Sequence, residues 1–149
     1  MKKREKALNN KGFSLVELII VIAIMAVLIG VLTPQYIKYL DKSKVAVDTT
    51  LADNLRQAML TTYLDPDKAI QAALPTGTDE DIPDNSPLNK YWTEVYNILG
   101  VANGAELEGK LKYKVGTTAP SITFTVDGNK NIEVEVIYAA SDSHNISIK

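Results

Sequence analysis

KGFSLVELIIVIAIMAVLIGVLTP, residues 11–34, places one carboxylate, that of Glu17, at the start of an otherwise apolar segment long enough to cross a bilayer. An ionisable group inside lipid costs roughly 2.5 to 3.5 kcal/mol on insertion scales, so a carboxylate there is expected to have a partner. Cleavage after Gly12 would create that partner, because it would leave a positively charged α-amine on Phe13. Within one chain the amine and Glu17 would lie about one helical turn apart, and between stacked chains the amine of one copy could neutralise Glu17 of the next.

These residues resemble the processing and assembly site of the type IV pilins and the related pseudopilins. The family pattern is a short basic leader ending in glycine, cleavage before phenylalanine, and a glutamate at the fifth mature position. Gly12, Phe13 and Glu17 stand at those three positions. The resemblance implies that a prepilin peptidase cuts between Gly12 and Phe13 and methylates the new amine, giving N-methylphenylalanine at Phe13. Phe13 and Glu17 would then direct assembly.

The charge distribution predicts the topology. The leader, residues 1–12, carries five basic residues against Glu5, so the positive-inside rule keeps it cytoplasmic and sends everything after Pro34 across the membrane. Residues 36–149 hold 11 basic and 16 acidic groups, which argues against non-specific nucleic-acid binding. We expect a single-pass protein of the cytoplasmic membrane before assembly and a surface or extracellular filament afterwards.

Two other interpretations of the N-terminus remain open. A conventional secretory signal has an apolar core of 7 to 15 residues before a small-x-small cleavage site, whereas this apolar run continues to Leu32 and meets Thr33-Pro34-Gln35-Tyr36. An uncleaved anchor would explain the length of the run but not Glu17. The chain has no cysteine, although many pilins of Gram-negative bacteria close their C-terminal region with a disulfide, so it most resembles a cysteine-free pilin.

One long helix is expected over residues 13–64, with a transmembrane and assembly half at 13–35 and an amphipathic half at 36–64. In the second half, apolar residues recur at helical spacing, and polar residues fill the other faces. The apolar set is Leu40, Val47, Leu51, Leu55, Met59 and Tyr63, and the polar set is Lys38, Asp41, Lys42, Asp48, Asp53 and Arg56. Pro34, with Gly30, predicts a kink rather than a helix end, because the periodicity resumes immediately.

The remaining pattern predicts a loop and then a sheet. Residues 65–110 indicate a connection with short helices, one at 67–74 and one capped by Ser86-Pro87, packed through Trp92 and ending at Gly100. Residues 111–149 alternate with period two and indicate an antiparallel sheet and C-terminal region. The expected strands are 111–115, 122–126, 132–138 and an edge strand at 145–148, with a hairpin turn at 127–130. The fold class is therefore α+β, a long N-terminal helix packed on a three- or four-stranded antiparallel sheet, which is the pilin layout.

The sequence does not predict catalysis or a cofactor. His144 is the single histidine, expected in an exposed loop, so no Ser-His-Asp triad or histidine metal cluster can form. Asp79, Asp81 and Asp84 are weak calcium candidates, but their segment has neither a turn glycine nor a distal bidentate glutamate. A solvated acidic loop is the preferred interpretation.

The resemblance implies a structural subunit of a type IV pilus-like filament that polymerises through its N-terminal helix. Its partners would be other pilin copies, the membrane, the prepilin peptidase and methyltransferase, and the assembly ATPase with its inner-membrane platform. A pseudopilin of a type II secretion or competence system is the first alternative, because it uses the same N-terminal device. A membrane-anchored binding or sensor domain is the second, and it predicts an uncut N-terminus.

Overall fold

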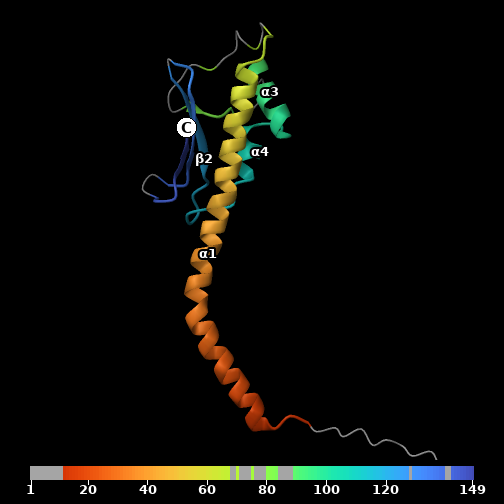
Figure 1. The fold of residues 1–149 in the computed structure, drawn as a ribbon, viewed down its shortest axis with the longest axis vertical. Helices are drawn as coiled ribbons and strands as arrows, with labels where there is room; N and C mark the ends of the chain where they lie inside the picture. The colour runs from red at the N-terminus through yellow and green to blue at the C-terminus, as the bar shows by residue number, and fades with distance from the viewer. Residues whose placement is uncertain are drawn as a thin grey trace, which may run out of the picture. The chain divides into compact units, whose positions relative to one another are not determined.

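The computed structural model describes residues 12–67, 70, 75, 80–83, 89–127, 129–139 and 142–149. The chain divides into two compact units, Met1–Tyr39 and Leu40–Lys149. Helix α1, Leu15–Tyr63, begins in the first unit and ends in the second (Figure 1). It continues through Pro34, which confirms the prediction that this proline does not end the helix.

The first unit exposes its apolar side chains. An 18-residue window of α1 has a mean hydropathy of 3.1 with none of its residues buried, so this helix is long and apolar enough to cross a membrane. Near its end, the Thr33 hydroxyl donates to the carbonyl of Ile29 at 2.6 Å, while Pro34 has no N–H to donate to the carbonyl of Gly30. Both features weaken the backbone hydrogen bonding of one helical turn. A kink at Gly30 and Pro34 stays a prediction.

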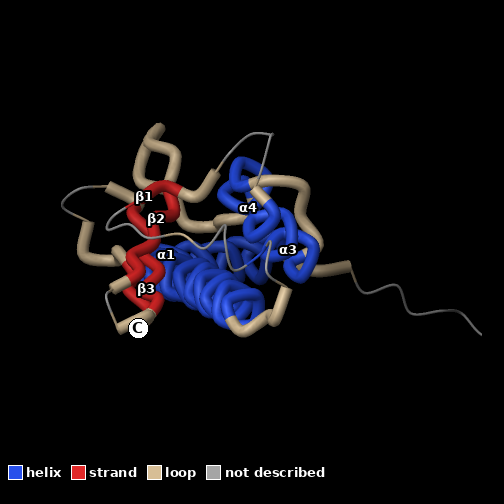
Figure 2. Tube along the Cα trace, turned by 90° about the horizontal axis from the view of Figure 1, so that it is seen from above, coloured by secondary structure: helices blue, strands red, loops and turns tan. Residues whose placement is uncertain are grey.

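The second unit, called the head below, combines the end of α1 with two short helices and a sheet. The helices are α3, Lys90–Leu99, and α4, Gly104–Gly109. The strands are β1 (Glu80–Asp81), β2 (Ser121–Val126), β3 (Ile132–Ile137) and β4 (Ile146–Ile148), antiparallel in the order β1-β2-β3-β4. The strands lie on one side of α1 and the short helices on another (Figure 2). The predicted α+β class and edge strand are confirmed, while β1 was not predicted.

The buried stripe of α1 agrees only in part with the predicted one, because Leu55 and Met59 are buried as expected but its first half is different. The residues that the head buries are Asp48, Ala52, Leu55, Ala58, Met59 and Thr62. Leu40 and Val47, expected to be covered, are 41% and 51% exposed. Consecutive helical residues are about 100° apart, so the stripe through Asp48 leaves Val47 on an uncovered face. The small side chains of Ala52 and Ala58 let the rest of the head approach the helix closely.

The short helices start from different caps than expected. The N-cap of α3 is Asn89, whose Oδ1 accepts the Trp92 N–H at 3.0 Å, whereas Ser86 and Pro87 lie outside the described residues. Gly100 ends α3 with a φ of 66°, a left-handed conformation that favours glycine. Trp92 is 4% exposed and meets the Phe124 ring at 5.1 Å, which confirms it as a packing anchor. Of the predicted 67–74 helix, the structure describes only its first residue and a helical, buried Ile70.

The predicted first strand is wrong. Residues 111–115 alternate between more and less buried side chains, yet they join no strand of the sheet and make one isolated bridge, from Val115 to Thr118. Their backbone has a different partner, because the N–H groups of Lys112 and Tyr113 donate to the carboxylate of Asp48. The hairpin between β2 and β3 is confirmed, since the Lys130 N–H donates to the Asp127 carbonyl at 2.9 Å.

Three carboxyl groups are expected to make the head less stable in acid. The Asn131 backbone N–H lowers the pKa of Asp127, the Ser147 hydroxyl lowers that of Glu133, and the His144 backbone N–H lowers that of Asp142. A carboxyl whose folded pKa is depressed contributes stability above its unfolded pKa, about 4, and loses it as the pH falls through the folded pKa. We expect the thermal unfolding midpoint to be nearly flat from pH 7 to about 5 and to fall below about pH 4. Circular dichroism checks this, and Asp127→Asn should reduce the acid-induced drop.

Candidate functional site

The N-terminus of α1 is closed by a reciprocal cap. Ser14 precedes the helix, and its hydroxyl oxygen accepts the Val16 N–H at 3.3 Å. The Glu17 carboxylate reaches back and accepts the Ser14 N–H at 3.2 Å. This is a variant of the capping box, in which a Ser and a Glu three residues later satisfy N–H groups that have no partner within the helix; here the Ser hydroxyl accepts from the second helical residue instead of the third. The sequence pattern Ser14-x-x-Glu17 is typical of a helix N-terminus, but its capping role was not predicted.

The cap also positions a charge. Glu17 lies in the first turn of α1, where the helix dipole favours an anion. The apolar segment that follows it has exposed side chains. One carboxylate accepts about four hydrogen bonds, so the Ser14 N–H leaves room for a second donor. Phe13 is 91% exposed, so its ring does not cover this end of the helix. The arrangement can therefore hold a cationic group beside Glu17.

Gly12 has no internal reason to be glycine. A Cβ built on Gly12 meets nothing within 4 Å, and its backbone is not in the left-handed region. Glycines are needed by a fold where a side chain would clash or where φ is positive, and neither applies here. Any requirement for glycine at this position therefore comes from a molecule that acts on the chain.

A buried carboxylate in the head was missed by the sequence analysis. Asp48 is 0% exposed and accepts three hydrogen bonds, from the Lys112 N–H at 2.7 Å, the Tyr113 N–H at 2.9 Å and the Tyr138 hydroxyl at 2.9 Å. Burial raises the pKa of Tyr138 well above its ordinary value, and the hydrogen bond to Asp48 adds a smaller increase. Asp48 was expected on a solvated face, and it instead ties α1 to the segment before β2 and to the end of β3.

The C-terminal loop joins the same cluster. The Tyr113 and Tyr138 rings meet edge to face at 4.9 Å, and the Tyr113 hydroxyl lies 3.2 Å from Nδ1 of His144. That nitrogen is also 2.7 Å from the Asp142 carboxylate. His144, expected in an exposed loop, is therefore half-buried and helps to hold the loop that leads into β4.

Of the three metal candidates, the structure describes only one. Asp81 is exposed in β1, and Asp79 and Asp84 lie outside the described residues. Within the described part of the chain, no group of three or more Asp, Glu, His or Cys side chains could hold a metal ion.

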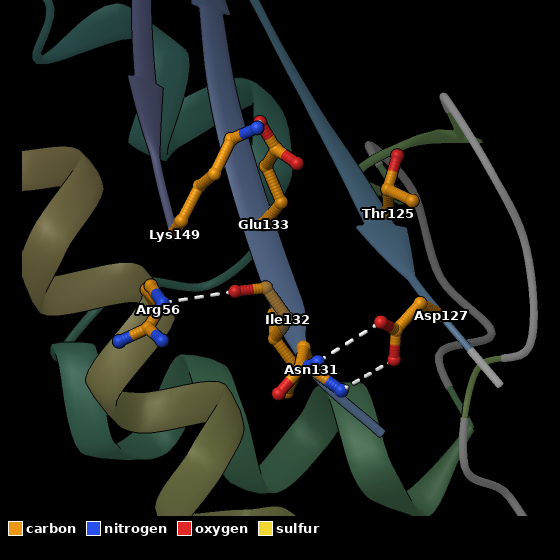
Figure 3. A pocket seen from close by; sticks show the side chains of 7 residues that line it. All are labelled: Arg56, Thr125, Asp127, Asn131, Ile132, Glu133 and Lys149. Carbon is orange, nitrogen blue, oxygen red and sulfur yellow. Dashed lines mark hydrogen bonds and ion pairs between the residues drawn. The ribbon is translucent and has the colours of Figure 1, made fainter. Parts of the chain in front are cut away.

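A cavity of about 350 Å³ opens between α1 and the β2–β3 hairpin (Figure 3). It is lined by Arg56, Thr125, Asp127, Asn131, Ile132, Glu133 and Lys149. Several of its polar groups bind one another, because Arg56 Nε donates to the Ile132 carbonyl at 2.8 Å and Lys149 pairs with Glu133 at 3.4 Å. The first contact ties α1 to β3, and the second ties the C-terminus to β3, so these polar groups have structural roles.

Comparison with known proteins points to one family. A family model described as the prokaryotic N-terminal methylation motif matches residues 8–33. The chain is similar to the type IV major fimbrial protein FimA of Dichelobacter nodosus, 28% identical over 143 residues, which cover 91% of this chain and 85% of that protein. It is 43% identical to a fimbrial protein of Moraxella nonliquefaciens over 52 residues, 35% of this chain and 34% of that protein. It is 33% identical to a fimbrial protein of Pseudomonas aeruginosa over 73 residues, 49% and 47% of the two chains. No solved structure gives a significant match.

The motif match covers the predicted cleavage site and Glu17, and the FimA match extends over most of the head. The long helix followed by an antiparallel sheet has the order expected from the sequence. The chain thus carries the N-terminal methylation motif and is similar, over most of its length, to a type IV fimbrial protein.

Proposed function

We propose that this chain is the structural subunit of a type IV pilus-like filament and polymerises through the first half of α1. The observation that carries this proposal is the apolar segment after Glu17, which has no covering in the single chain. Such a surface is stable in lipid, but in a water-exposed protein it must be covered, because apolar burial is worth about 25 cal/mol per Å². Packing identical helices against one another covers it in every copy.

Processing would prepare the subunit for this step. A prepilin peptidase would cut after Gly12 and methylate Phe13, and the new amine of one subunit would pair with Glu17 of its neighbour. The basic leader would hold the precursor at the cytoplasmic face until then. An assembly ATPase and a membrane platform would move the subunit from the membrane into the filament.

The test is mass spectrometry of material sheared from the cell surface, combined with electron microscopy of filaments labelled by antibody to the head. We expect a chain that begins at methylated Phe13 and filaments that carry the label. A secretion or competence pseudopilin would instead give loss of export or DNA uptake without surface fibres. A membrane-tethered domain would keep its leader and stay in the membrane fraction.

Replacing Gly12 with valine is expected to stop cleavage and filament formation. Because the structure offers no internal reason for glycine, the added side chain would interfere with the peptidase and not with folding. Intact mass of the membrane-extracted protein should show the leader still attached. Phe13→Leu is the matched control and should be processed, since the methylated atom is the backbone nitrogen. Normal processing of Gly12→Val would contradict the assigned cleavage role.

A further inference from the structure

One turn of α1, residues 36–39, is aromatic and basic and directly follows the apolar segment. Tyr36 and Tyr39 are 63% and 68% exposed, and Ile37 between them is 52% exposed. Lys38 is exposed as well. All four residues belong to the first unit of the chain, Met1–Tyr39. The described structure thus leaves their side chains largely uncovered, so their surroundings come from outside the single chain.

These side chains point in different directions around the helix. Consecutive helical residues are about 100° apart, so Tyr36 and Tyr39 lie about 60° from each other, whereas Lys38 lies about 160° from Tyr36. A docking surface for one protein partner would gather its anchors on one face. Packing identical helices around this turn would bury the charge of Lys38, which is costly without a partner. A bilayer surface surrounds a helix on all sides and fits the arrangement better.

The chemistry of the turn suits the headgroup region of a bilayer. Tyrosine has an apolar ring and a polar hydroxyl, and it is enriched where membrane meets water. Lysine extends its charged end from an apolar stem toward water, and its ammonium group can donate three hydrogen bonds to phosphate oxygens. Asp41, the nearest carboxylate along the helix, pairs with Lys44 at 3.3 Å. Among the described residues no ion pair includes Lys38, so its charge remains available to a lipid phosphate.

The spacing between Glu17 and Tyr36 matches the thickness of a membrane. The two residues are about 28 Å apart along an α-helix, and the hydrocarbon core of a bilayer is about 30 Å thick. Residues 18–35 between them contain no charged side chain. With Tyr36 at one boundary of the hydrocarbon, Glu17 reaches the other boundary and Ala26 lies near the middle.

We propose that Tyr36, Lys38 and Tyr39 form an interfacial belt that binds phospholipid headgroups at the exported face of the membrane and sets the depth of α1 before assembly. The tyrosine hydroxyls meet the headgroups, and Lys38 extends to a lipid phosphate. At this depth the bond between Gly12 and Phe13 lies on the cytoplasmic side of the hydrocarbon. This inference rests on the proposed function and adds a lipid-binding site to it.

Nitroxide labels on single engineered cysteines test the depth, because the natural chain has no cysteine. The full-length protein is reconstituted in bilayers of phosphatidylethanolamine and phosphatidylglycerol. Electron paramagnetic resonance then compares the access of oxygen and of a water-soluble nickel complex to each label. The labelled positions are Ala26, Gln35 and Asn54, which are all exposed. We expect the label of Ala26→Cys near the bilayer centre, that of Gln35→Cys at the hydrocarbon boundary and that of Asn54→Cys in water.

Variants of the belt test whether its side chains set this depth. Tyr36→Leu with Tyr39→Leu keeps apolar bulk and removes the hydroxyls, so the boundary should move from residue 36 toward residue 39 and the Gln35→Cys label should lie about 4 Å deeper. Adding Lys38→Gln should deepen the label further, because it removes the charge that binds phosphate. Tyr36→Trp with Tyr39→Trp is the matched control and should leave the label in place, since tryptophan is also enriched at membrane interfaces.

The inference is overturned if the Gln35→Cys label is as accessible to the nickel complex as the Asn54→Cys label, or as deep as the Ala26→Cys label. An unchanged depth in the leucine variant also overturns it. If that variant keeps its depth and forms fewer filaments, the tyrosines contact other subunits instead of lipid. These results leave the proposed function intact. An Ala26→Cys label in water would instead count against the proposed function, because the first half of α1 would then not enter the bilayer.

Discussion

Replacing Asp48 with alanine is expected to destabilise the head by about 3 to 5 kcal/mol. The side chain is 0% exposed, and its removal leaves the Lys112 and Tyr113 N–H groups and the Tyr138 hydroxyl without their acceptor. A buried donor that loses its acceptor costs about 1 to 3 kcal/mol, and a domain of this size has only about 5 to 15 kcal/mol in total. Urea unfolding of the full-length protein in detergent, followed by near-ultraviolet circular dichroism, measures the loss.

Asp53→Ala is the matched control on the same helix. Its carboxylate accepts a hydrogen bond from Gln57 at an exposed site, so its loss should cost about 0.5 kcal/mol or less. Asp48→Asn should fall between the two, because it keeps one oxygen acceptor and turns an amide N–H₂ toward a donor. If the Asp48→Ala and Asp53→Ala variants have the same free energy of unfolding, the buried carboxylate is not a structural anchor.

The hydrogen bonds to Asp48 explain why the sequence predicted the fold class but placed residues 111–115 in the sheet. Alternation in residues 111–115 tells which side chains face inward, yet it does not tell what binds the backbone. Here the acceptor is a side chain 64 residues earlier, on a helix. A lone aspartate in an amphipathic helix normally faces water, so only its place in the buried stripe could have identified Asp48. The first half of that stripe was predicted one residue away, at Val47 and Leu51.

Strand β1 was missed for a related reason. Its two residues, Glu80 and Asp81, are acidic and exposed and carry no strand pattern. They pair with Phe124 and Thr123 of β2, and the next residue, Ile82, donates its N–H to Ile122 at 3.2 Å. The strand thus depends on an available sheet edge rather than on its own sequence. The proposed N-terminal site is different, because the spacing of Gly12, Phe13 and Glu17 can be read directly from the sequence.

Replacing Glu17 with alanine is expected to lower the number of filaments at least about tenfold, because a charge pair in a low-dielectric setting is worth more than about 1.4 kcal/mol. The variant should still be cleaved after Gly12. It should also remain in the membrane, since removing a charge from an apolar helix lowers its insertion cost by roughly 2.5 to 3.5 kcal/mol. Filament counts by electron microscopy and intact mass of the membrane fraction measure the two outcomes separately.

The capping box requires a further distinction, because Glu17 both accepts the Ser14 N–H and carries a charge. Glu17→Gln keeps an oxygen for the cap and removes the charge, whereas Ser14→Ala removes the hydroxyl half of the cap and keeps the charge. If Glu17 acts by pairing with the amine of a neighbouring subunit, Glu17→Gln should assemble as poorly as Glu17→Ala, and Ser14→Ala should assemble almost normally. The reverse pattern would mean that the carboxylate serves the start of its own helix, and the charge pairing between subunits would have to be abandoned.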